Sequence, residues 1–294
     1  MIFIVLTIVS STALFVIFKL AANWGIDKYP VILINYFTAF ILGFIIISLG
    51  NKGFQIHQNW LLFAFAIGFL FIVMFYLIAI STRMAGIAVT GIASKMSVVF
   101  PILFSLFIDT TDKLSWLKSL GIITALLAIL LTAYKKEDGK VKKEKMLLPI
   151  LLFIGMGLTD SVVKWAQYTV VSNDKVLPFS TTIFIFSAIT GIIFGICKKE
   201  KIRNIFQYKS LLLGFMLGVF NLGSIFFIIR ALNHQNTITL ERVDGSIVFG
   251  TTNLGIVSLS VLVGLIFFKE KISPVNWIGI SLSVVSVVLL AFSN

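Results

Sequence analysis

Apolar segments of membrane-spanning length recur along this chain of 294 residues, and they constrain its fold more than any other feature. A helix needs about 20 apolar residues to cross a bilayer. Lipid offers no hydrogen-bond partners, so each segment must be helical, and the segments are too long to be barrel strands. We therefore predict an all-α integral membrane protein. Its ten predicted spans are 2–22, 31–49, 60–80, 86–108, 116–134, 146–168, 179–197, 210–232, 243–268 and 277–292.

The composition and the position of the charges support this class. Hydrophobic residues make up 59% of the chain and charged residues only 12%, far from the balance of soluble domains. The net charge of +12 comes mostly from short loops, as on the cytoplasmic side of membrane proteins, so we expect no nucleic-acid partner. We predict a multi-pass protein of the cell (inner) membrane, with the charged connector 135–145 in the cytoplasm and both termini outside.

Cysteine and histidine usage excludes several kinds of chemistry. The one cysteine, Cys197, cannot form an internal disulfide, and both histidines, His57 and His234, lie in predicted loops. We therefore expect no metal, no cofactor and no catalytic residues. The chain also lacks the Gly-x-x-x-x-Gly-Lys-Ser/Thr loop of a primary pump.

The fourth span, GIAVTGIASKMSVVFPILFSLFI at 86–108, carries Lys95 near its middle. A lysine at the centre of a span costs about 2.5–3.5 kcal/mol even on the mildest insertion scale, and charges there usually serve a function. Ser94 and Ser97 are its hydroxyl neighbours, and Pro101 removes a backbone donor. The pattern predicts one wall of a polar path. The alternative is a lysine buried against a carboxylate for packing only.

The two halves of the chain contain matching motifs. Asp112-Lys113-Leu114-Ser115 and then Gly121 accompany span five, and Glu270-Lys271-Ile272-Ser273 and then Gly279 accompany span ten. The serine can cap the helix that follows it, and we expect the acid to lie near the positive end of that same helix. We predict a first five-helix repeat at 1–134, a connector at 135–145 and a second repeat at 146–294.

An odd number of spans in each repeat inverts the second half relative to the first. Inverted repeats are common in secondary transporters, which bind substrate near the midplane. Lys19, near the end of span one, matches Lys164, near the end of span six. The two lysines would lie toward opposite faces, as gate residues do. The alternative is that both reach to the lipid headgroups.

Other polar residues complete the candidate site. Glycines recur every five residues between 239 and 255, which favours a partly unwound ninth span, although a loop before an ordinary helix fits equally. Asp160 and Lys164 are four residues apart on one helix face, which favours their pairing. The excess of basic residues favours a substrate with a carboxylate or phosphate. The candidate substrate-binding residues are Lys95, Asn253, Lys19, Lys164, Asn35 and Tyr36, and the candidate coupling or gating residues are Asp160, Glu241, Arg242 and Asp244.

Close helix packing is predicted by two Gly-x-x-x-Gly pairs, Gly191 with Gly195 and Gly214 with Gly218. In a bundle of ten helices we expect these pairs to serve internal packing. A monomer and a homodimer both fit the sequence.

The spans, the duplicated motif, and Pro101 eleven residues before Asp112 resemble the EamA-type transporters of the drug/metabolite transporter superfamily. This chain departs from that pattern at Asp112, where glutamate is usual, and at Leu259, where span nine lacks a proline. The resemblance implies a secondary transporter, often an exporter, of amino acids or other small metabolites, with protons or another gradient driving it. A multidrug cation exporter of the same superfamily is the alternative, and an intramembrane enzyme is the least favoured.

Overall fold

The computed structural model describes residues 2–50, 54, 56–108, 114–134, 136–137, 140–141, 143–171, 175–198, 205–232 and 245–292. The first half contains α1 (Ile2–Asn23), α2 (Lys28–Leu49), the short 3-10 helix η1 (Gln58–Trp60), α3 (Leu61–Met84), α4 (Ile87–Met96), α5 (Val99–Ile108) and α6 (Trp116–Ala133). The second half contains α7 (Lys143–Thr169), α8 (Val176–Lys198), α9 (Tyr208–Leu232), α10 (Gly245–Ile266) and α11 (Pro274–Ala291). Between the halves, the strands β1 (Lys136–Glu137) and β2 (Lys140–Val141) pair antiparallel.

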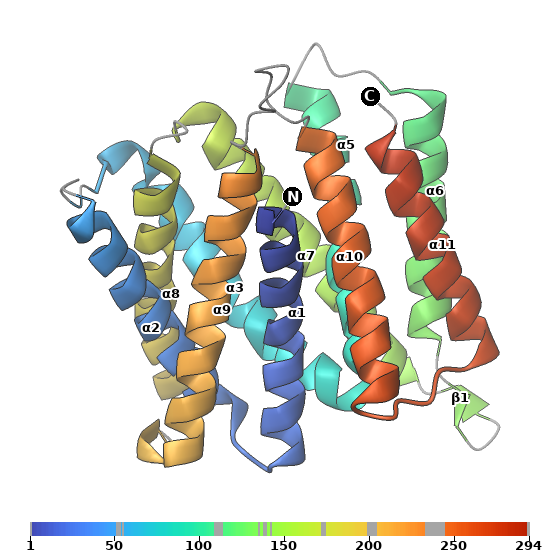
Figure 1. The fold of residues 1–294 in the computed structure, drawn as a ribbon, viewed down its shortest axis with the longest axis horizontal. Helices are drawn as coiled ribbons and strands as arrows, with labels where there is room; N and C mark the ends of the chain where they lie inside the picture. Colours follow the sequence, from blue (N-terminus) through green and yellow to red (C-terminus); the bar gives the residue numbers. More distant parts are fainter. Residues whose placement is uncertain are drawn as a thin grey trace.

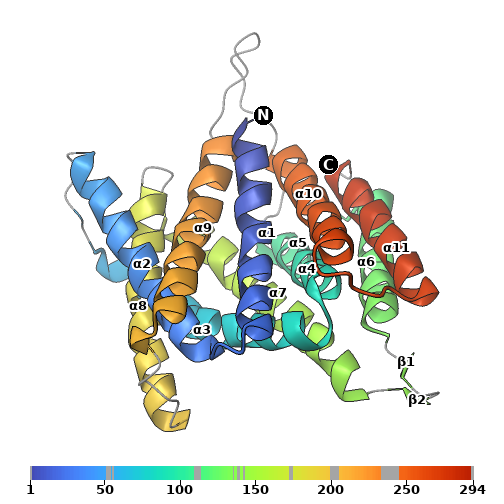
Figure 2. The same ribbon diagram turned by 60° about the horizontal axis from the view of Figure 1, so that its bottom comes forward.

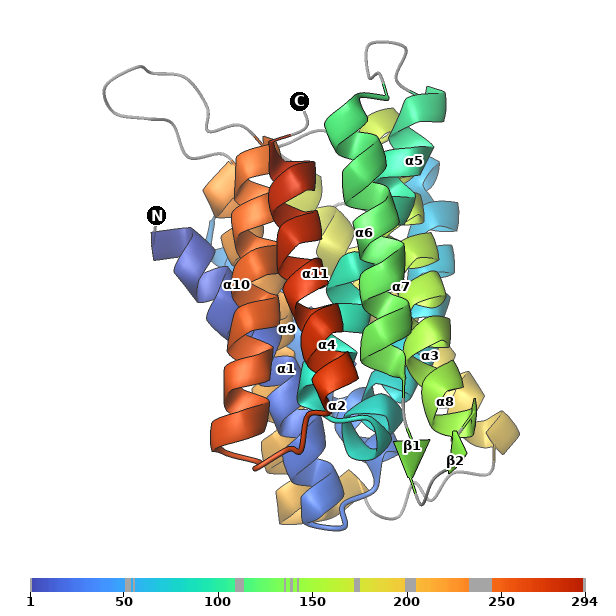
Figure 3. The ribbon, with the colours of Figure 1, turned by 90° about the vertical axis from the view of Figure 1, so that its right-hand side faces the viewer.

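The described helices confirm the predicted membrane class. Nine candidate spans are long and apolar enough to cross a bilayer, with α4 and α5 sharing one of them. A shorter apolar helix, Thr251–Ile266 within α10, accounts for the tenth predicted span. The helices run up and down the bundle, and both termini lie toward the end opposite β1 and β2 (Figures 1 and 3). Helix α1 lies between α9 and α10 (Figure 2).

The fourth span is broken about halfway along its length. Helix α4 ends at Met96 and α5 begins at Val99. Pro101 has no N–H with which to bond the carbonyl of Ser97 four residues earlier. That carbonyl accepts instead from the N–H of Phe100, at 2.9 Å. The predicted loss of a backbone donor therefore produces a break in the helix between Lys95 and Pro101.

Two forms were predicted for the ninth span, a partly unwound segment and an ordinary helix, and its described residues form an ordinary helix. Helix α10 is continuous from Gly245 to Ile266, so the glycine-rich stretch 250–255 is helical rather than unwound. Glycine weakens a helix by only about 1 kcal/mol per residue. The stretch 250–255 contains no proline, so every residue has a backbone N–H for a helical hydrogen bond. The rest of the predicted unwound segment, 239–244, lies outside the described residues.

Helices α6 and α11 pack closely through the glycines of the duplicated motif (Figure 3). A Cβ atom added to Gly121 would lie 2.7 Å from Leu290, and one added to Gly279 would lie 2.7 Å from Thr132. Each contacted residue is the eleventh after the glycine of its own helix (121 to 132 and 279 to 290). The two contacts are therefore reciprocal, and the two helices run antiparallel.

The serines of the motif have the predicted capping role. Ser115 Oγ accepts from the backbone N–H of Lys118 at 3.2 Å. Ser273 Oγ accepts from the backbone N–H of Asn276, also at 3.2 Å. In each helix the donor is the third residue after the serine, so the caps share one register.

The same reciprocity relates α2 and α8. Gly43 of α2 lies against Thr181 of α8, and Gly191 of α8 lies against Leu33 of α2. In α2, Gly43 is the tenth residue after Leu33. In α8, Gly191 is the tenth residue after Thr181, so the two contacts are related in the same reciprocal way.

The Gly-x-x-x-Gly pairs serve internal packing, as predicted. Gly191 and Gly195 of α8 lie against Leu33 and Tyr29 of α2. The pair in α9 also faces α2: Gly214 meets Ile34, and Gly218 meets Thr38. The two pairs hold α8 and α9 against the one helix between them.

We expect Gly279→Ala to lower the stability of the folded protein by about 1–3 kcal/mol, because the new methyl group would overlap backbone atoms of α6. The matched control is Gly223→Ala in α9, where the methyl group would meet other side chains only at 3.4 Å. Both substitutions gain the same helix propensity. Thermal unfolding of detergent-purified variants measures the difference. Equal midpoints for the two variants would contradict the packing described.

Candidate functional site

The break in span four brings opposite charges together within the membrane. Lys95 lies in the last turn of α4, and Asp160 of α7 faces it closely enough for an electrostatic interaction. The hydroxyl of Ser97, in the break itself, lies 3.2 Å from Asp160 Oδ2 and 2.6 Å from the carbonyl oxygen of Ser94. The structure therefore provides an ammonium group, a carboxylate and a hydroxyl at the centre of a span.

This arrangement explains how the charged side chains are tolerated. An isolated charge in the bilayer is costly, and such residues normally face the bundle interior and pair with one another. Helix α7 packs against both α4 and α5, which brings Asp160 to the break that Pro101 creates. Within the described part of the chain, the two charges interact electrostatically without a direct ion pair.

The predicted pairing of Asp160 with Lys164 is wrong. Asp160 turns toward Ser97 and Lys95 of the first half. Lys164 is exposed, and its Nζ donates to the carbonyl oxygen of Pro101 at 3.4 Å. An ion pair between residues four apart on a helix surface stabilises the helix by only about 0.2–0.5 kcal/mol. The contacts of Asp160 with the first half are favoured over it.

A second charged cluster lies where α4 begins. Lys19 Nζ, near the end of α1, is 3.0 Å from Glu270 Oε1, and the two side chains are only 15% and 12% exposed. The Glu270 carboxylate also accepts from the backbone N–H of Ile87, at 2.8 and 3.0 Å, and of Ala88, at 3.4 Å. Lys19 Nζ further donates to the carbonyl oxygen of Thr82 at 3.0 Å. Glu270 thus caps α4 and holds Lys19.

The sequence pattern predicted the place of Glu270 wrongly. Its expected place was the positive end of α11, the helix that follows it, whereas its carboxylate lies on the positive end of α4. Gly86 precedes α4 with φ of 96°, and a Cβ there would lie 2.6 Å from the Glu270 carboxylate. A Cβ on Gly264 would lie 2.7 Å from it. The sequence signal was that span four begins with Gly86, which has no side chain to cap the helix. The capping group therefore has to come from another part of the chain.

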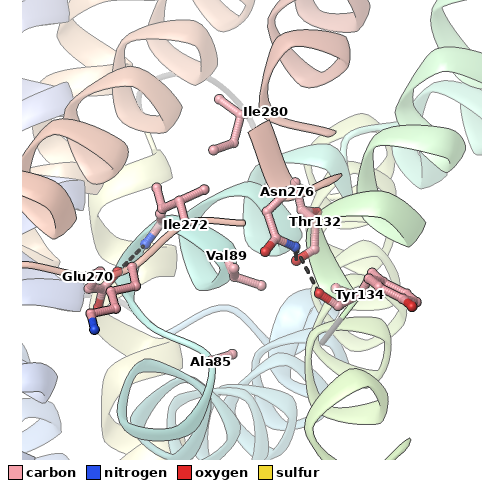
Figure 4. Close-up of a pocket in the computed structure, with 11 residues that line it drawn as sticks. Ala85, Val89, Thr132, Tyr134, Glu270, Ile272, Asn276 and Ile280 are labelled. Carbon is pink, nitrogen blue, oxygen red and sulfur yellow. Dashed lines mark hydrogen bonds between the residues drawn. The ribbon is translucent and has the colours of Figure 1, made fainter. Parts of the chain in front are cut away.

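A narrow cavity adjoins this cluster (Figure 4). Glu270 and Ala85 lie on one side of it, and Thr132, Tyr134 and Asn276 lie on the other (Figure 4). The Asn276 amide donates to the carbonyl oxygens at the end of α6, among them Thr132 at 2.8 Å and Tyr134 at 2.9 Å. The cavity volume of about 30 Å³ accommodates water rather than a metabolite.

The remaining predicted site residues are distributed over several elements. Asn35 of α2 is buried and accepts from Asn221 of α9 at 3.1 Å. Tyr36 is also buried, and its hydroxyl has no hydrogen-bond partner within the described parts of the chain. Asn253 is half-buried in α10. Glu241, Arg242 and Asp244 lie outside the described residues. Of the predicted set, the structure brings together Lys95 and Asp160.

Comparison with known proteins supports the fold and names no activity. No family model matches the chain. An uncharacterized protein of Haemophilus influenzae is 27% identical to it over 298 aligned residues, which cover 98% of this chain and 97% of that protein. The crystal structure of a protein that is 16% identical covers 97% of this chain and 98% of its own, with a TM-score of 0.57. The fold over the matched part of the chain therefore also occurs in a solved structure.

A double-mutant cycle tests the interaction of Lys95 with Asp160. We expect Lys95→Met and Asp160→Asn each to destabilise the protein, because each leaves the other charge uncompensated. The double variant should lose less than the sum of the two, with a coupling free energy of about 1 kcal/mol or more. Unfolding by SDS titration measures it. The matched cycle of Lys164→Met with Asp160→Asn should give no coupling, and coupling there instead would contradict the geometry.

Proposed function

We propose that this protein is a secondary active transporter of a small polar metabolite that carries a carboxylate, with export as the direction. One observation carries the proposal: span four breaks halfway across the bundle, where the Ser97 hydroxyl lies 3.2 Å from Asp160 Oδ2 and Lys95 is near enough to interact with Asp160 electrostatically. Transporters bind substrates at midplane sites formed by discontinuous helices. Lys95 would bind the substrate carboxylate, and Ser97 would supply a hydrogen bond.

We further propose that the two halves are inverted five-helix repeats. The reciprocal contacts of Gly121 with Leu290 and of Gly279 with Thr132 support this, since a two-fold relation between the halves would generate both. The contacts Gly43–Thr181 and Gly191–Leu33 have the same property. The location of both termini at one end of the bundle agrees with two repeats of five spans (Figure 1).

Asp160 is the proposed coupling group. Carboxylates inside membrane segments form the proton relays of many transporters. Proton binding would neutralise Asp160 and leave Lys95 as an uncompensated cation, ready for an anionic substrate. Proton binding and substrate binding would thereby favour each other.

Membership of the EamA-type transporters is part of this proposal. It is supported by the duplicated motif, by the all-helical architecture and by Pro101 at the break. Loop charges support an orientation with β1 and β2 on the cytoplasmic side of the cell membrane.

Ligand-induced stabilisation tests the function and searches for the substrate in the same experiment. Thermal shift of the purified protein is measured against amino acids, dicarboxylates, phosphorylated sugars and lipophilic cations. A ligand at 100 times its Kd stabilises the fold by about 2.7 kcal/mol. We expect a carboxylate compound to raise the midpoint and to be transported in proteoliposomes. Lys95→Ala should abolish both effects while the protein still inserts, and the exposed control Lys209→Ala should retain both.

The multidrug exporter is the second candidate because Asp160 makes no direct ion pair with any described residue and can receive a cation. The same panel separates the two functions. Stabilisation by lipophilic cations that is lost in Asp160→Asn and retained in Lys95→Ala would replace the first proposal with the second.

A further inference from the structure

The ion pair between Lys19 and Glu270 joins the two halves at one end of the bundle. Lys19 comes from α1 and contacts the last turn of α3 through Thr82. Glu270 comes from the segment between α10 and α11, and it bonds the first turn of α4. Four separate elements meet at one carboxylate and one ammonium group.

The contacts fit a closure that can be released as a unit. The described donors to Glu270 all come from the first half: Lys19 Nζ and the N–H groups of Ile87 and Ala88. The Glu270 carboxylate fits beside Gly86 and Gly264 because neither has a side chain, and a Cβ atom on either would overlap it. If Glu270 withdrew with the second half, every one of these contacts would break together.

Unpartnered hydroxyls lie deeper in the bundle than this ion pair. Thr12, Ser94 and Ser260 are at most 3% exposed, and none has a hydrogen-bond partner within the described parts of the chain. They come from α1, α4 and α10, which pack against one another. A Cβ on Gly91 would lie 2.7 Å from Ser260 Oγ, and Ser94 is one turn further along α4. Buried hydroxyls normally have partners, so these groups indicate a seam that meets water or ligand in another state of the protein.

The corresponding lysine of the second half is in a different environment. Lys164 is exposed, whereas Lys19 is 15% exposed. The two lysines lie near the ends of α1 and α7, which point to opposite ends of the bundle (Figure 1). The structure is therefore tightly closed around Lys19 at the end where β1 and β2 lie.

We propose that Lys19 and Glu270, seated on the first turn of α4, form a gate that closes the β1–β2 end of the transport path. The gate shields the seam of Thr12, Ser94 and Ser260 from the solution on that side. This inference rests on the proposed transport function and adds to it the residues that control access. Lys19 and Glu270 act by positioning the helices and need not touch the substrate.

Cysteine accessibility tests the gate. The reporter is Ser94→Cys in a Cys197→Ala background, in vesicles that expose the β1–β2 end to a membrane-impermeant maleimide. The reporter should be protected when the gate is intact. Glu270→Gln and Lys19→Gln should each increase the labelling rate about tenfold, because each removes one charge of the pair. Lys19→Arg keeps the charge and should keep the protection, and Lys271→Gln, on the exposed neighbour of Glu270, should leave the rate unchanged.

A second reporter distinguishes a gate from a structural ion pair. Ala125→Cys is placed at a fully buried position of α6, in the part of the bundle that packs against α11. A gate exposes residue 94 and leaves residue 125 protected. Unchanged labelling at 94 in both glutamine variants would overturn the proposal, and so would increased labelling at both positions, since the pair would then hold the fold together.

The result is independent of whether a substrate has been found. Increased labelling at 94 alone, combined with no flux of any compound tested, would leave the gate in place and remove the transport function. Flux with unchanged labelling would retain the transport function and remove the gate.

Discussion

Within hydrocarbon, a backbone carbonyl or a charged group has only the protein itself as a partner. At the break in span four, this constraint falls on the carbonyl of Ser97, which Pro101 cannot satisfy. The N–H of Phe100 replaces the missing donor, so the bond to Ser97 spans three residues instead of the four of a regular α-helix. At this interruption of the regular helical hydrogen bonds, the Ser97 hydroxyl lies beside Asp160. A single missing N–H thus accounts for both the broken helix and the polar group in its interior.

The glycine contacts solve a different problem, which is how long apolar helices associate when lipid is as apolar as they are. Association in membranes depends on close van der Waals packing, and small residues permit it. Gly121 and Gly279 let the backbones of α6 and α11 approach, while Gly43 and Gly191 do so for α2 and α8. Because these interfaces join the halves, their reciprocal geometry describes the relation of one half to the other better than the short motifs do.

The membrane class, the span limits and the two serine caps could be predicted because each depends on local pattern. Apolar length determines a span, and Ser115 and Ser273 cap helices in their own sequence neighbourhood. The tertiary partners of the charged residues could not be predicted in this way. Asp160 lies near Lys164 in sequence, yet it turns to Ser97, 63 residues away. Glu270 caps a helix that begins 183 residues earlier. Such pairings depend on which helices pack together, and a single sequence does not encode that in its periodicity.

The two charged clusters lie at opposite ends of one short helix. Glu270 is bound to the first turn of α4, and Lys95 is in its last turn. The ten residues of α4 form one uninterrupted helix about 15 Å long. At its start α4 is held by the carboxylate of the second half, and at its end lies a break that can absorb a change of angle. A displacement of Glu270 would therefore be transmitted to Lys95 without any change within α4. This mechanical link offers a physical route from the closure at the end of the bundle to the charges at its centre.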